Sequence, residues 1–103
     1  MHYLLIYELS PGYVERRESF RQEHLALARE AHLRGELMLG GTLADPVDGA
    51  IFLFHGDSPA PASRFAAADP YVLHGLVNHW QVRPWVTVVG TETGTPAHPH
   101  THM

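Results

Sequence analysis

The sequence predicts one α+β domain in which an antiparallel sheet carries helices on one face. Three observations predict this class: four segments have the composition of strands, two repeat apolar side chains every three or four residues, and their order is strand, helix, strand, strand, helix, strand. The 103 residues, 45% of them hydrophobic, suffice for one modest core and not for two domains. We expect the domain to span residues 1–90 and residues 91–103 to form a polar tail containing histidine and proline.

The first third of the chain is predicted to form a strand and then a long helix. Residues 2–9 have the two-residue period of a strand, and the Ser-Pro-Gly that follows ends it. In residues 14–34 apolar side chains recur at spacings of three and four, which is typical of a helix with one inward face. That face carries Phe20, His24, Leu27, Ala28 and Ala31. Arg17 and Arg21 are expected to lie mostly off it, and Gly35 ends the helix.

The middle of the chain is predicted to form a hairpin. Residues 36–41 (ELMLGG) and residues 50–55 (AIFLFH) are the second and third strands. The link between them contains Asp-Pro and Asp-Gly, both typical of turns, and it is short enough for an antiparallel pair. The glycines Gly40 and Gly41 indicate a bulge or a close approach of another backbone.

The last third is predicted to contain a short helix over residues 62–68, one helical turn over residues 71–74 and a final strand over residues 76–89. Asp69 suits the N-cap of that turn because a proline follows it at the first helical position. Pro84 removes a backbone donor from the final strand, so the strand is bent there or lies at an edge of the sheet.

This order of elements is that of the ferredoxin-like fold, βαββαβ. Two short helices can cover only one face of the sheet, yet strands such as AIFLFH are apolar on both faces. The uncovered face then needs a partner, and a second copy of the chain is the simplest one. We therefore expect a homodimer.

Composition excludes several classes of function. The chain has no cysteine and no lysine, which excludes disulfides, thiolate catalysis, lysine Schiff bases and a phosphate-binding P-loop. The net charge of −4 makes nucleic acid a poor partner, and no apolar run is long enough to span a membrane. The first residues lack the pattern of a signal peptide, so we expect a cytoplasmic protein.

Two titratable side chains are the main candidates for chemistry. His24 is expected in the middle of the inward helical face, where a histidine either is satisfied by a carbonyl or a water or pairs with a carboxylate that fixes its tautomer. Asp69 is best placed for that pairing, because one carboxylate can cap a helix and also accept an imidazole N–H. Together they are predicted to form a general acid–base pair at the edge of a cleft.

Three further residues are candidates for binding a substrate. Arg83 shares one face of the final strand with Trp85 and suits a carboxylate or a phenolate, although a surface or dimer-interface role is the more frequent alternative. Tyr71, close to Asp69 in the chain, and Gly41 complete the set.

The nine histidines also raise the question of a metal site. His98, His100 and His102 alternate in the tail, and in an extended chain they fall on one side, a pattern that can bind zinc, nickel or copper. A polar tail with adventitious metal affinity is the alternative, and we favour it. The other histidines show no spacing typical of ligands, so we expect neither a metal nor a cofactor.

Four short motifs occur in a characteristic order: EHL in the predicted helix, GELMLGG, DPY and VRPW. In this order and spacing the sequence resembles the YciI-like (YCII-related domain) proteins, over residues 1–89. The resemblance implies a ferredoxin-like fold, a dimer, and an active site on a histidine and an aspartate, which correspond here to His24 in EHL and Asp69 in ADPY. Thr42 stands where many relatives have proline, and the histidine-rich tail is not part of the family pattern.

Two functions remain open from the sequence. The resemblance implies a small enzyme, since one characterised relative type is a dehydrochlorinase of chlorinated hydroxyquinols and the wider group includes muconolactone isomerases and small monooxygenases. The first hypothesis is therefore a cofactor-free enzyme of lyase or isomerase type that moves a proton on a small, possibly aromatic or carbonyl-bearing molecule. The second is a non-catalytic, dimeric module that binds a small ligand. They differ in whether the His24 side chain reaches an open cavity.

Overall fold

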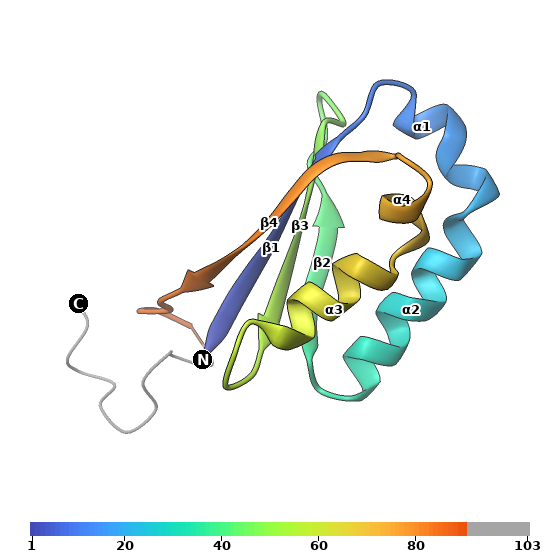
Figure 1. The fold of residues 1–103 in the computed structure, drawn as a ribbon. Helices are drawn as coiled ribbons and strands as arrows, with labels where there is room; N and C mark the ends of the chain where they lie inside the picture. Colours follow the sequence, from blue (N-terminus) through green and yellow to red (C-terminus); the bar gives the residue numbers. More distant parts are fainter. Residues whose placement is uncertain (91–103) are drawn as a thin grey trace.

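The computed structural model describes residues 1–90 and confirms the ferredoxin-like α+β fold. In chain order the elements are β1 (His2–Leu9), α1 (Tyr13–Arg16), the 3₁₀ helix η1 (Arg17–Ser19), α2 (Arg21–Leu33), β2 (Leu37–Thr42), β3 (Gly49–His55), α3 (Ala60–Ala68), α4 (Pro70–Leu73) and β4 (Val77–Trp85). The strands form one antiparallel sheet in the order β2-β3-β1-β4, and Figure 1 shows α2, α3 and α4 on one side of it. The tail histidines His98, His100 and His102 lie outside the described residues.

The core lies between the sheet and the helices. The helix-facing side of β1 carries four buried side chains, Tyr3, Leu5, Tyr7 and Leu9. In the neighbouring strands Leu5 lies opposite Phe52 and Val82. Phe65 of α3 packs against Phe52, with ring centroids 5.3 Å apart. This packing holds α3 over the sheet, so that Asp69, which joins α3 to α4, lies in the interior.

The first predicted helix is interrupted. The sequence predicts one helix over residues 14–34, whereas the chain forms α1, η1 and α2 in succession. The interruption is at Phe20, where φ is −123° and ψ is 0°, outside the helical region. The Phe20 ring stacks on the His74 ring with centroids 4.2 Å apart, which anchors the bend to the end of α4. Because Phe20 also fits the three-and-four spacing, the period alone does not reveal the break.

The final strand is shorter than predicted. It ends at Trp85 rather than at residue 89 because β4 is an edge strand with β1 as its single neighbour, and β1 begins at His2, which pairs with Trp85. Residues beyond Trp85 therefore have no strand to pair with. The edge position also accommodates Pro84, since a proline in an edge strand can direct its missing donor away from the sheet.

The other face of the sheet is open and apolar. No helix of residues 1–90 covers it (Figure 1). Its centre is formed by the half-buried side chains of Leu4, Ile6, Ile51 and Leu53. Leu39 of β2, which pairs with Leu53, is 71% exposed. Within the described chain, no helix is long and apolar enough to cross a membrane.

Candidate active site

The site is built around a buried carboxylate. Asp69 joins α3 to α4 and is fully buried, with 0% of its surface exposed. It caps α4 as the sequence predicts, because its Oδ1 accepts the backbone N–H of Tyr71 at 3.0 Å. Its Oδ2 accepts the hydroxyl of Tyr7 at 2.6 Å. A carboxylate removed from water in this way is retained because donors surround it.

His24 is the third donor to this carboxylate. It lies on the inward side of α2, and its Nδ1 is 2.9 Å from Asp69 Oδ1. Because the carboxylate can only accept, we assign the proton to Nδ1, which leaves the lone pair on Nε2. The His24 ring also stacks on Tyr71, with centroids 4.0 Å apart and planes inclined by 10°. The stacking and the hydrogen bond together fix the orientation of the imidazole.

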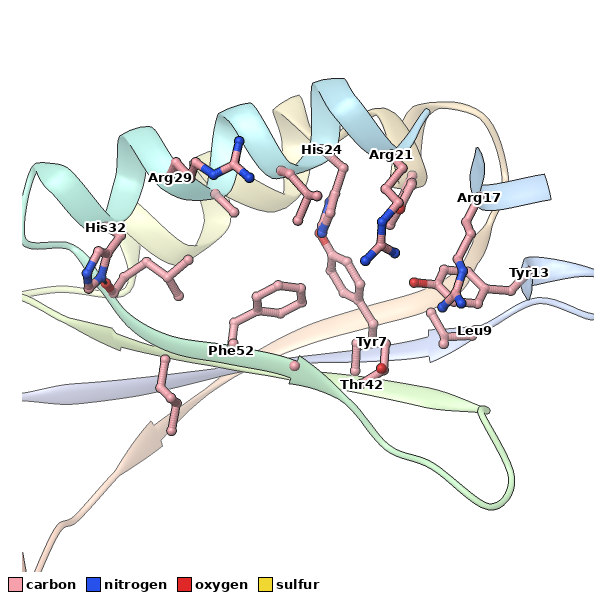
Figure 2. Close-up of a pocket in the computed structure, with 18 of the residues that line it drawn as sticks. Tyr7, Leu9, Tyr13, Arg17, Arg21, His24, Arg29, His32, Thr42 and Phe52 are labelled. Atoms are coloured by element: carbon pink, nitrogen blue, oxygen red, sulfur yellow. Dashed lines mark hydrogen bonds between the residues drawn. The ribbon is translucent and has the colours of Figure 1, made fainter. Parts of the chain in front are cut away.

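A cavity of about 490 Å³ opens beside His24, between α2 and the sheet (Figure 2). The His24 side chain is 11% exposed, it lines this cavity, and Nε2 makes no hydrogen bond to any described residue. The apolar part of the wall includes Leu25, Ala28, Leu37 and Phe52. A volume in this range is typical of small-molecule sites. The observation that separates the two hypotheses from the sequence is therefore an open cavity at His24.

Two buried tyrosines keep their protons at this site. Burial, and then the neighbouring Asp69 charge, raises the pKa of Tyr7 far above its usual value. Burial also raises the pKa of Tyr71 to about 12. Tyr71 lines the cavity, and its buried hydroxyl makes no hydrogen bond within the described residues. The neighbouring Tyr13 side chain adds to the rise in the Tyr71 pKa. Tyr7 therefore supports Asp69, and Tyr71 presents an unused donor.

Arginines supply the charge of the cavity wall, and no aspartate or glutamate of residues 1–90 lines it. Arg17 of η1 and Arg21 and Arg29 of α2 line it. Both Arg17 and Arg21, which the sequence places mostly off the apolar face of the predicted helix, line the cavity. Figure 2 shows the Arg21 side chain descending from α2 beside His24, with Arg17 at the same end of the cavity. Their spacing of four residues does not by itself reveal this placement, because Arg17 lies in η1 and Arg21 in α2, on either side of the bend at Phe20.

The structure brings most of the predicted site residues together. His24, Asp69 and Tyr71 are in mutual contact, and Gly41 of β2 lines the opposite wall of the cavity. Arg83 is not brought to this cavity. It is exposed on β4 opposite Leu4, which places it on the open face, so the sheet separates it from His24 of the same chain. Tyr7 also belongs to the site, because its hydroxyl donates to Asp69, and the sequence did not indicate this contact.

Within residues 1–90, no three side chains of histidine, aspartate or glutamate are grouped so that they could hold a metal ion. His32, at the far end of the cavity, uses its Nδ1 for the carbonyl of Leu37 at 2.7 Å. His24 and Asp69 are thus the titratable pair at this cavity that a hydrogen bond joins directly.

The chain is thus a small α+β domain of ferredoxin-like topology, with a histidine–aspartate pair between α2 and the sheet. The family model of the YCII-related domain matches residues 1–86, and the chain belongs to this family. None of the curated proteins matches the sequence.

Solved structures share the fold at low identity. One is 5-chloro-2-hydroxyhydroquinone dehydrochlorinase (TftG) from Burkholderia phenoliruptrix AC1100 in complex with 2,5-dihydroxybenzoquinone, with a TM-score of 0.67 and 22% identity over 84% of this chain and 95% of that one. Another is protein Atu4242 from Agrobacterium tumefaciens, with a TM-score of 0.54 and 17% identity over 91% of this chain and 98% of that one. A NIPSNAP family protein, Atu5224, of the same organism has a TM-score of 0.53 and 16% identity over 84% and 90%.

Proposed function

We propose that this protein is a cofactor-free enzyme that moves a proton on a small molecule, in a reaction of lyase (dehydrochlorinase) or isomerase type, with His24 as general base and acid. One observation carries the proposal: Asp69 holds Nδ1 of His24, and the His24 ring, whose Nε2 makes no hydrogen bond to a described residue, lines an open cavity. A neutral imidazole with a fixed tautomer and a free lone pair is what general-base catalysis requires near neutral pH.

The proton transfer balances without an oxidant or a nucleophile. His24 Nε2 takes a proton from a substrate carbon, and the electron pair of that C–H bond forms a new π bond. In an elimination, the pair of the adjacent carbon–halogen bond leaves with the halide, so the products are the alkene, the halide and a proton. In an isomerisation, the imidazolium returns the proton to a different carbon. Each half of this cycle needs one group that accepts and releases a proton in place.

The neighbours of His24 support the charged intermediate. When Nε2 is protonated, the imidazolium lies against the Asp69 carboxylate at 2.9 Å, in a buried setting where the attraction between opposite charges is strong. The Tyr7 hydroxyl holds the second carboxylate oxygen, so Asp69 cannot rotate away from His24. The Tyr71 ring, stacked on the imidazole, prevents the ring from tilting out of the cavity.

The structural similarity to TftG supports this choice of reaction. That protein is a dehydrochlorinase, and its complex contains a small, flat, oxygen-rich ring. A ring of that size suits a cavity of about 490 Å³ lined on one side by Phe52. We propose that the substrate here is likewise a small, possibly aromatic or carbonyl-bearing molecule, and that the protein works as a cytoplasmic homodimer.

The test is exchange of carbon-bound hydrogen in D₂O. A panel of small enolisable carbonyl compounds and hydroxyquinols, with chlorinated members, is incubated with the protein and followed by NMR for deuterium uptake and by ion chromatography for chloride. We expect at least one compound to react, and the His24→Gln variant to be slower by about 10²- to 10⁴-fold. His79→Gln, in the exposed part of β4, is the matched control and should keep the wild-type rate.

The result that would overturn the proposal is an unchanged rate in folded His24→Gln. Binding of panel members without exchange or chloride release would instead favour the non-catalytic binding module. Thermal unfolding of both variants establishes that each is folded under the assay conditions.

A further inference from the structure

The charge of the cavity is strongly one-sided. Among its lining side chains are the arginines Arg17, Arg21 and Arg29, and no carboxylate. Asp69 lies behind His24, is fully buried and already accepts three hydrogen bonds. None of the three arginines forms an ion pair with a described residue, although the chain as a whole has a net charge of −4. Acidic side chains are thus abundant in the protein but are kept out of this cavity.

Two of these arginines, Arg17 and Arg21, lie at one end of the cavity. Arg17 and Arg21 are four residues apart on either side of the bend at Phe20, and Figure 2 shows both on the same side of His24 as Tyr13. Arg21 is near enough to Tyr71 that its charge opposes the rise in the Tyr71 pKa. Like charges that line one cavity repel each other, and no described carboxylate forms an ion pair with either arginine. Such a pair is unfavourable for the empty protein and favourable for binding an anion.

The same end of the cavity holds hydrogen-bond donors that have no acceptor. Arg17 Nε is buried and makes no hydrogen bond within the described chain, while its guanidinium lies 5.7 Å from the centre of the Tyr13 ring. The buried hydroxyl of Tyr71 is also without an acceptor there. Buried donors are nearly always paired, and an unpaired one is costly. An oxyanion between these groups would satisfy both.

From these contacts we infer that the substrate is a small organic anion whose carboxylate or ring oxyanion is bound by Arg17, Arg21 and the Tyr71 hydroxyl, with its apolar body on the Phe52 side of the cavity. The planar fork of arginine matches a carboxylate in two hydrogen bonds. The inference rests on the proposed function in one respect, which is that the reacting carbon of this anion lies at His24 Nε2. It assigns to Arg17 and Arg21 the anion-binding role for which Arg83 is a candidate from the sequence.

The experiment compares an anion with a neutral molecule of the same shape. Binding of benzoate and of benzamide to the full chain is measured by calorimetry or ligand-observed NMR at low salt. We expect benzoate to bind at least about tenfold more tightly than benzamide. Arg21→Gln should weaken the binding of benzoate by at least about tenfold and leave the binding of benzamide unchanged. Arg21 is exposed, so this replacement does not threaten the fold, and Arg17→Gln should act in the same direction.

Arg64→Gln is the charge-matched control, because Arg64 lies on α3 away from the cavity and is 66% exposed. Equal binding of benzoate and benzamide, no binding of benzoate at millimolar concentration, or an equal loss in Arg64→Gln and Arg21→Gln would each overturn the inference. His24→Gln separates it from the proposed function. That variant should keep benzoate binding while losing exchange, and if it keeps both, the acid–base proposal fails and the anion site stands.

Discussion

Replacement of Asp69 by asparagine should separate the chemistry of the site from the stability of the fold. Asparagine caps helices as well as aspartate does, so the Tyr71 N–H keeps its acceptor. The amide oxygen can still accept from His24 Nδ1, while the amide NH₂ faces the Tyr7 hydroxyl, which then accepts instead of donating. The hydrogen bonds are retained but lose their charge. We expect the free energy of unfolding to fall by only about 1 to 3 kcal/mol.

The effect on proton transfer should be much larger. Asparagine carries no charge to stabilise the His24 imidazolium, and in its flipped orientation it would donate to Nδ1 and move the ring proton to Nε2, which removes the base. The exchange rate should therefore drop by about 10²- to 10⁴-fold. Histidine-selective ¹H–¹⁵N NMR reports the tautomer directly, and the wild type should show the proton on Nδ1.

The matched variant is Asp69→Ala. It removes the cap of α4, worth about 1 kcal/mol, and it leaves the Tyr7 hydroxyl and the His24 N–H buried without an acceptor, at about 1 to 3 kcal/mol each. That loss is comparable with the whole stability of a small domain. Urea unfolding measures both variants. A folded Asp69→Asn protein with the wild-type exchange rate would refute the acid–base pair, and equal stability of the two variants would refute the hydrogen-bond argument.

Three other predictions concern Tyr7, Gly40 and Leu39. The free energy of unfolding should fall as the pH rises above about 10, because Tyr7 keeps its proton in the folded protein and loses it in the unfolded chain. The expected slope is about 1.4 kcal/mol per pH unit for each such group, and urea titrations at a series of pH values should show a smaller slope for Tyr7→Phe. Gly40→Ala should destabilise the protein by about 1 to 3 kcal/mol, because its Cβ would lie 2.8 Å from the Phe52 ring. The control is Gly41→Ala, which should melt at the wild-type temperature because a Cβ at Gly41 meets nothing within 4 Å. Leu39→Glu should convert the proposed dimer into a monomer without a loss of helicity, because Leu39 is 71% exposed on the open face. Multi-angle light scattering measures the mass of both proteins, and a wild-type monomer at micromolar concentration would contradict the proposed dimer.

The fold could be predicted from the sequence because each helix and strand has a pattern of its own in the residues that form it. The two-residue period of β1 already places Tyr7 on one face with Tyr3, Leu5 and Leu9, and the sequence Asp69-Pro70 already indicates a cap and a helix start. The hydrogen bond of Tyr7 to Asp69 could not be predicted in the same way. It joins residues 62 positions apart, and its length depends on how α3 packs on the sheet rather than on any pattern in the chain.

The face on which Arg83 lies shows a second limit. A strand period tells that Arg83 and Trp80 point to opposite faces, and the structure agrees, since Trp80 lies opposite Tyr7 and Arg83 lies opposite Leu4. The period does not tell which face the helices cover. That depends on the register with β1, where Tyr7 is buried and Leu4 is on the open side. A shift of one residue would have placed Arg83 under the helices.

The geometry of α2 explains why the apolar pattern of the sequence does not identify Arg21 as a cavity residue. At about 100° per residue, Leu27 and Ala31 lie about 60° and 20° to one side of His24, whereas Arg21 and Ala28 lie about 60° and 40° to the other. The first side packs into the core, where Ala31 is fully buried, and the second side lines the cavity. His24 is therefore at the border between a dry face and an open one. That position lets the same ring bond to a buried carboxylate with one nitrogen and meet a solvated ligand with the other.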